Sequence, residues 1–303
     1  MHAATTIAAA LALSVSGTRA IEPGPPAGSL YSARIWGVGG PVRAERTERL
    51  GILLRDPRGR LVRDLLEEHE KPLHAILVRS DLGWFEHIHP ESTGVGTFEA
   101  SVRFPGDGQY AVFLDFATPS DGPQVVRVPL AVGSGRQGAG EVFDPGGDEV
   151  REREIDGYTV RLEAGGAIEA GAAARLRYIV ERDGEPLAEF EPYLGARAHL
   201  VVIGADVETF RHAHALGSHE EGADQQDEHA GHECHGQHAH HERAPQPHTG
   251  HAPGAMAVEP GTLEFDVRVE APGVYRAWAQ FQHEGRVITA PFTINVRAAG
   301  EPD

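Results

Sequence analysis

The sequence predicts an all-β protein made of two tandem antiparallel immunoglobulin-like β-sandwich domains, with a disordered His-rich loop in the second domain. Three observations predict it. Short segments of alternating apolar and polar residues recur along the chain, turn-forming Gly, Pro and Asp separate them, and an internal repeat spans most of both halves. The 303 residues suit two domains of ordinary size, and no helical stripe of any length is present.

The chain begins with a predicted signal peptide over residues 1–20. Residues 7–15 form a short apolar run, and Thr-Arg-Ala at 18–20 is an acceptable cleavage site. The run is too short to anchor the protein, so no transmembrane segment is expected in the mature chain. A disordered Ala-rich tail is the alternative, since no Lys or Arg precedes the run. We expect a periplasmic or secreted protein.

The first sandwich domain is predicted over residues 28–133 and the second over 155–298, joined by a Gly-rich flexible linker over 134–154. The repeat supports these limits. "KPLHAILVRSDLGWFEHIHPE" (71–91) matches "ARAHLVVIGADVETFRHAHAL" (196–216) without a gap, and "FEASVRFPGDGQYAVFLDF" (98–116) matches "FDVRVEAPGVYRAWAQF" (265–281). Farther on, Pro129 aligns with Pro291.

Strands in the second domain are predicted where apolar and polar residues alternate and turn-forming residues lie at both ends. The predicted strands are "YTVRLEA" (158–164), "AARLRYIVE" (173–181), "HLVVIG" (199–204), "LEFDVRV" (263–269), "YRAWAQF" (275–281) and "APFTINV" (290–296). Six or seven such strands in each copy favour a sandwich.

The two copies differ in one connection, where the second carries an insertion over residues 217–258. Its centre reads "DEHAGHECHGQHAHHERAPQPHTGH" (227–251), and nine histidines lie from His219 to His251. With few apolar residues it cannot fold alone. Imidazoles at this density, with one thiol, bind Cu, Ni and Zn readily. The candidate ligands in the insertion are His229, His232, Cys234, His235, His238, His240 and His241. A pH-sensing role and a solvated loop are the alternatives.

Each copy also contains the spacing His-x12-His-x-His. If residues 73–79 and 84–89 form a hairpin over the loop 80–83, His74 lies opposite His89, and His87 lies on the same face. The second copy repeats this arrangement with His199, His212 and His214. Opposed side chains on paired strands start about 5 Å apart, so three imidazoles can converge on one ion.

The same face carries Val78 and Phe85, so we expect it to turn toward its own sandwich core, with the histidines at the rim of that core. Three imidazoles favour copper, zinc or nickel as the divalent transition metal. His283, Glu284 or water could supply a fourth ligand. The alternative is that the six histidines are structural residues of the fold.

The histidine-containing segments and the strands that follow them are similar to those of a known family. The two His-containing segments, each followed by a Pro-Gly-x-Tyr-type strand, and "FQHEGRVITAPF" (281–292) resemble the YtkA-like family of exported bacterial modules over roughly residues 45–132 and 157–297. The resemblance implies an immunoglobulin-like sandwich, an envelope location and an association with metal-transport components. The His-rich insertion and Ala215, which stands where the first copy has Pro90, depart from the pattern.

The composition limits the classes of binding partner that we expect. A net charge of −18 disfavours nucleic acid and anionic lipid, and it favours cations. With one cysteine, no intrachain disulfide can form. We therefore expect a non-enzymatic metal buffer or chaperone that binds copper first, then zinc or nickel, with a metal-transport component of the envelope as a possible protein partner. A non-catalytic structural or protein-interaction module is the main alternative. A three-His metalloenzyme is a weaker one, because no nucleophile motif, carboxylate pair or phosphate loop accompanies the histidines.

Overall fold

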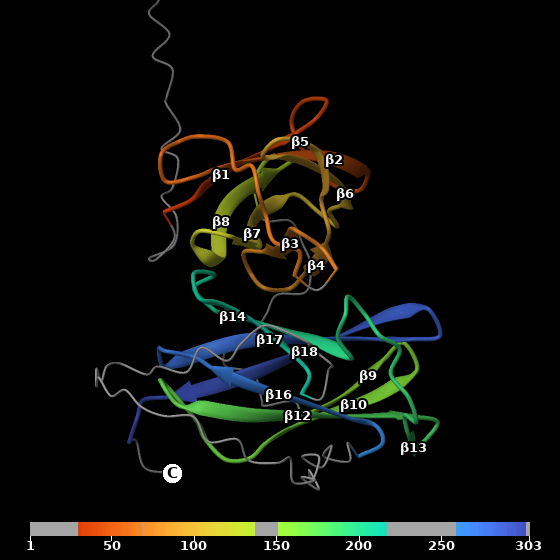
Figure 1. Ribbon diagram of the computed structural model, residues 1–303. Helices are drawn as coiled ribbons and strands as arrows, with labels where there is room; N and C mark the ends of the chain where they lie inside the picture. Colours follow the sequence, from red (N-terminus) through yellow and green to blue (C-terminus); the bar gives the residue numbers. More distant parts are fainter. Residues whose placement is uncertain (1–29, 69, 137–150, 217–258, 301–303) are drawn as a thin grey trace, which may run out of the picture.

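The computed structural model describes residues 30–68, 70–136, 151–216 and 259–300. These residues form strands, turns and bends arranged as two β-sandwich domains, which confirms the predicted fold class (Figure 1). The part of the chain that the structure describes contains no helix long and apolar enough to cross a membrane. The predicted signal peptide, most of the linker and the His-rich insertion lie outside the described residues.

The first domain pairs two four-stranded antiparallel sheets, with strand orders β1-β2-β6-β5 and β4-β3-β7-β8. Its strands are β1 (Ser32–Gly37), β2 (Thr47–Arg55), β3 (His74–Arg79), β4 (Phe85–Ile88), β5 (Glu91–Gly94), β6 (Thr97–Arg103), β7 (Gly108–Thr118) and β8 (Gly122–Val132).

The second domain repeats this plan. One sheet runs β15-β14-β17-β18-β11, and the other contains β9, β10, β12 and β13, with β16 paired to β12. Its strands are β9 (Glu152–Ile155), β10 (Tyr158–Ala164), β11 (Ile168–Glu169), β12 (Ala173–Arg182), β13 (Glu185–Pro186), β14 (Ala198–Gly204), β15 (Phe210–His214), β16 (Thr262–Arg268), β17 (Gly273–His283) and β18 (Arg286–Arg297). All six strands expected from the sequence are present.

The duplication holds at the level of strand register. His74 pairs with Asp115 between β3 and β7, and His199 pairs with Gln280 between β14 and β17, so Asp115 and Gln280 occupy equivalent positions. The proposed equivalence of the two prolines was wrong. Pro129 pairs with Ala111, whereas Pro291 pairs with Trp278, two positions farther along its hairpin.

Each domain has its own apolar core, and a tyrosine at the equivalent position of each forms a hydrogen bond with the backbone just upstream. Tyr110 donates a hydrogen bond to the carbonyl of Gly106 at 2.8 Å, and Tyr275 donates to the carbonyl of Ala271 at 2.8 Å. A tyrosine bonded to backbone a few residues upstream is a recurrent feature of immunoglobulin-like sandwiches. Leu77 and Ala75 of β3 point into the first core, which also contains the residues Leu50, Ile52, Phe98 and Phe116.

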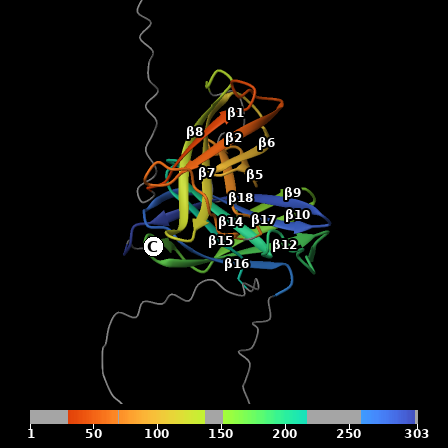
Figure 2. The ribbon, with the colours of Figure 1, turned by 45° about the horizontal axis from the view of Figure 1, so that its top comes forward.

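A third apolar cluster joins the domains. It contains Ile76 and Val78 of β3 together with Val201 and Ile203 of β14, so the outer faces of both strands contribute to the contact between the domains. Both strands are buried at every position. Figures 1 and 2 show the first domain seated on the sheet of the second domain that contains β14, β17 and β18. The histidine face of each hairpin therefore points toward the other domain and not toward its own core, so that expectation was wrong.

The interface is reciprocal. Phe85 stacks on Trp278 with ring centroids 4.8 Å apart, and Phe113 stacks on Phe210 at 5.0 Å. Phe85 is equivalent to Phe210 and Phe113 to Trp278, so exchanging equivalent residues converts one pair into the other. Such exchange is the property of a two-fold interface between like subunits. The two domains meet as a pseudo-symmetric pair within one chain.

Candidate metal centre

The β3–β4 and β14–β15 hairpins position the histidines as their spacing predicted. Ala75 pairs with Ile88 and Val78 with Phe85, a register that places His74 opposite His89. In the second domain His199 pairs directly with His214. The turn length sets this register, and a shift by one residue would move every side chain to the other face.

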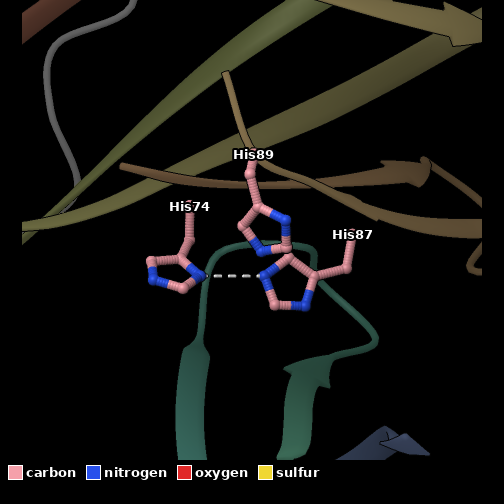
Figure 3. A group of neighbouring side chains, drawn as sticks. All are labelled: His74, His87 and His89. Atoms are coloured by element: carbon pink, nitrogen blue, oxygen red, sulfur yellow. Dashed lines mark hydrogen bonds between the residues drawn. The ribbon is translucent and has the colours of Figure 1, made fainter. Parts of the chain in front are cut away.

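The first triad consists of His74, His87 and His89, which point together from the first domain toward a teal segment of the second (Figure 3). Nδ1 of His74 lies 3.1 Å from Nε2 of His87. The ring of His89 lies 5.0 Å from that of His74 and 4.8 Å from that of His87, centroid to centroid. One nitrogen from each ring lies within 4.8 Å of the other two.

The second triad, His199, His212 and His214, has the same form. Nδ1 of His199 lies 3.2 Å from Nε2 of His212. The ring of His214 lies 4.8 Å from that of His199 and 4.9 Å from that of His212. The ligand atoms again fall within 4.8 Å of one another.

Acceptors on the outer side fix the tautomers in both triads. Nε2 of His74 donates to the carbonyl of Glu68 at 3.1 Å, and Nε2 of His199 donates to the carbonyl of Tyr193 at 2.8 Å. A carbonyl can only accept, so the inward Nδ1 of each neutral ring carries a lone pair.

The middle histidine of each triad is fixed by the opposite domain. Nδ1 of His87 lies 2.9 Å from Oε1 of Gln280, whose amide nitrogen donates to Thr289 at 3.0 Å. Nδ1 of His212 lies 2.9 Å from Oδ2 of Asp115. Both outer nitrogens therefore donate, and in the neutral rings both inward Nε2 atoms carry lone pairs.

In each triad, two inward imidazole nitrogens thus lie 3.1–3.2 Å apart, and both carry lone pairs when the two rings are neutral. Such a contact is repulsive unless a cation or a proton lies between the nitrogens. Two nitrogens bound at about 2.0–2.1 Å in tetrahedral geometry lie about 3.3–3.4 Å apart, close to the separation found here. Outer hydrogen bonds that orient the rings are also the usual support of metal-bound histidine.

Burial favours the neutral, metal-binding form of the rings. Burial, then the neighbouring imidazoles, holds the pKa of His87 well below its ordinary value. Burial and then His74 lower the pKa of His89 to about 4. Within the described residues, Nε2 of His89 is buried without a hydrogen-bond partner, as expected of a nitrogen oriented for an ion.

The two triads adjoin each other across the domain interface. Ring centroids are 5.6 Å apart for His87 and His212, 5.8 Å for His74 and His212, and 6.2 Å for His87 and His199. His199 is completely buried and His74 nearly so, while His89 and His214 are partly exposed. An ion would therefore reach the histidines from the side of His89 and His214.

Two of the three proposed fourth ligands, His283 and Glu284, lie elsewhere, so that part of the expectation was wrong. His283 lies 2.7 Å from the hydroxyl of Tyr158, and Glu284 forms an ion pair with Arg182 at 2.7 Å. Both are engaged with strands of the opposite sheet. The seven candidate ligands of the insertion, His229, His232, Cys234, His235, His238, His240 and His241, lie outside the described residues.

Sequence reasoning missed Asp115 and Gln280. Their neighbours Phe116 and Phe281 aligned in the repeat, so the equivalence of the two positions was available. Their contact with histidines of the other domain was not, because only the packing of the domains creates it.

A family model described as "Domain of unknown function (DUF8832)" matches residues 33–133 and 153–298. The chain belongs to this family. The match covers both sandwich domains, and both triads lie inside the matched segments of this DUF8832 protein. The resemblance to the YtkA-like family stays a prediction. No curated protein matches the chain.

Solved structures similar to this DUF8832 chain include a bacterial adhesin and two other proteins. The Escherichia coli adhesin FdeC is 13% identical with a TM-score of 0.24, over 87% of this chain and 63% of the adhesin. Invasin, a bacterial integrin-binding protein, is 12% identical with a TM-score of 0.25, over 90% of this chain and 40% of invasin. The fibronectin(III)-like modules of Clostridium thermocellum CbhA are 9% identical with a TM-score of 0.22, over 89% of this chain and 97% of the modules.

Proposed function

We propose that this DUF8832 protein is an exported, non-catalytic metal-binding protein that holds divalent transition metal in its two histidine triads, as a buffer or chaperone of the cell envelope. The observation that carries the proposal is the close approach of two inward imidazole nitrogens in each triad, at 3.1–3.2 Å, with each of these rings oriented by a hydrogen bond on its outer side. A metal ion bound between these nitrogens would use all three rings of a triad.

The donor set favours copper, then zinc or nickel. Three neutral imidazoles without sulfur suit Cu(II), Zn(II) and Ni(II), and the only methionines of the chain are Met1 and Met256, so a Met-rich Cu(I) site is excluded. The His-rich insertion would capture ions loosely and raise their local concentration beside His214, where the insertion departs from the sandwich.

A structural role is the second candidate, and one observation favours it. His87 and His212 each form a hydrogen bond with a residue of the other domain, so they contribute to the interface whether or not a metal is present. Under this hypothesis the histidines are architecture and the insertion alone binds metal.

Removing the insertion separates the two candidates. The first domain closes the equivalent connection without it, through β5. In the second domain the amide of Leu216 donates to the carbonyl of Glu264 at 2.8 Å, so the flanking chain already lies beside β16. About eight Gly and Ser residues, which reach about 26–29 Å, can therefore replace residues 217–258.

Cu(II) and Zn(II) are titrated calorimetrically into this loop-replaced chain. We expect tight binding that is lost from one site in the variant His199→Ala/His212→Ala/His214→Ala and retained in the control His283→Ala. Loss of all tight binding on loop replacement, in a chain that still unfolds cooperatively, would overturn the proposal. It would assign metal binding to the insertion and a structural role to the triads.

A further inference from the structure

The two triads are equivalent in their ligands and different in what supports them. Asp115 and Gln280 occupy the same position in the duplication, and each contacts the middle histidine of the other domain's triad. His212 is thus supported by a carboxylate and His87 by a neutral amide. Among the described contacts, this is a chemical difference between the two side chains that hydrogen-bond to the middle ligand rings.

Both contacts are well formed. Nδ1 of His212 lies 2.9 Å from the Asp115 carboxylate, and the two side chains are 7% and 16% exposed. His87 and Gln280 are buried, and Thr289 holds the Gln280 amide so that its oxygen faces His87. Neither contact is a loose surface pairing.

The difference bears on metal affinity. A carboxylate that accepts the outer N–H of a metal-bound imidazole increases the electron density on the ligand nitrogen, and its charge offsets part of the charge of the ion. An amide orients the ring equally well but supplies no charge. Removing such outer partners changes metal affinity by about 10–100-fold.

The spacing of the triads adds a second effect. Rings of the two triads lie 5.6–6.2 Å apart across the interface. Two dications, one in each of these adjoining triads, would repel each other in a partly buried setting, so the first ion would weaken binding of the second. The first ion should therefore bind in the triad supported by Asp115, because that carboxylate offsets part of the charge of the ion.

We propose that the two triads form one unequal two-ion centre between the domains. The triad His199, His212 and His214 fills first and holds a resident ion, because Asp115 supports it. The triad His74, His87 and His89 fills second, binds more weakly and holds the exchangeable ion. This inference rests on the proposed function.

The test exchanges the two supporting residues. The loop-replaced chain is titrated with Cu(II) or Zn(II) against a competing chelator, and each step is assigned with the variants His87→Ala and His212→Ala. Asp115→Asn should weaken the tighter step by about 10–100-fold, and Gln280→Glu should strengthen the weaker step. Asp115→Asn combined with Gln280→Glu should reverse the order of filling.

Two readouts support the assignment. Thermal unfolding without metal shows whether each variant is folded. If Asp115→Asn does not fold, Gln280→Glu alone tests whether the supporting residue sets the affinity of its triad. With two equivalents of Cu(II), electron paramagnetic resonance of the loop-replaced chain should show dipolar broadening and a half-field signal from neighbouring ions, and with one equivalent it should not.

The outcomes separate this inference from the proposed function. The unequal two-ion centre would be overturned if two tight binding steps kept their affinities after the exchange at positions 115 and 280. It would also be overturned if two bound Cu(II) ions showed no magnetic coupling. Either result would leave metal binding itself intact. No tight step in the loop-replaced chain would overturn both.

Discussion

His212 of the second domain places its Nδ1 2.9 Å from the carboxylate of Asp115 in the first domain. The equivalent contact in the other direction joins His87 to Gln280. These two contacts, together with the apolar cluster beside them, connect the candidate metal centre to the packing of the domains. Metal binding and domain association are therefore expected to reinforce each other.

Saturating Zn(II) is expected to raise the melting temperature of the loop-replaced chain. An ion at about 100 times its dissociation constant stabilises the folded state by about 2.7 kcal/mol, or about 5–10 °C for a protein of this size. Differential scanning calorimetry should show the shift in the control His283→Ala and a smaller shift in His212→Ala. Equal shifts in both variants would place the stabilising ion outside the triads.

Without metal, stability should fall on acidification before the carboxylates titrate. The folded chain holds the pKa of His87 and His89 below the unfolded value of about 6.5, with His89 at about 4. The unfolded chain therefore binds more protons once the pH drops below about 6.5, and the free energy of unfolding declines from there toward about pH 4.

Urea unfolding in EDTA between pH 7.5 and 4 measures this decline. His89→Gln should flatten it, and because the carboxylates are common to both chains, the difference isolates His89. An identical pH dependence in the two chains would contradict the depressed pKa.

The aromatic pair Phe85 and Trp278 should stabilise the domain interface. Trp278→Ala removes a buried indole and is expected to cost about 3–5 kcal/mol in the free energy of unfolding. In a double-mutant cycle with Phe85→Ala, the stacked rings should show a coupling of about 0.5–1.5 kcal/mol. Chemical denaturation measures both, with the exposed Val287→Ala as control. A coupling near zero would show that the rings do not stabilise the contact.

A side chain at position 96 should destabilise the protein. The φ of Gly96 is +63°, and a Cβ would lie 2.9 Å from the carbonyl oxygen of Val62 and 3.1 Å from that of Leu54. Gly59 has a similar φ of +75° but open space around it. Gly96→Ala should therefore destabilise the protein by about 1–3 kcal/mol more than Gly59→Ala. Equal losses in equilibrium unfolding would mean that backbone conformation alone matters at these positions.

The local sequence determined the hairpins and the triads. Within a hairpin, the turn length fixes which residues oppose each other, so the placement of His74 opposite His89 follows from spacing alone. The duplication made the second triad predictable from the first. Alternation and bounding turn residues likewise predicted six strands of the second domain, while the short strands β9, β11 and β13 were not predicted.

Only the tertiary structure decided which face of β3 and β14 is covered by the other domain. Every position of these strands is buried, so their sequences show no alternation that could separate the inner face from the outer. The contacts of His87 with Gln280 and of His212 with Asp115 join residues 193 and 97 positions apart in the chain. Such contacts depend on the mutual fit of two folded surfaces, and no local pattern records that fit.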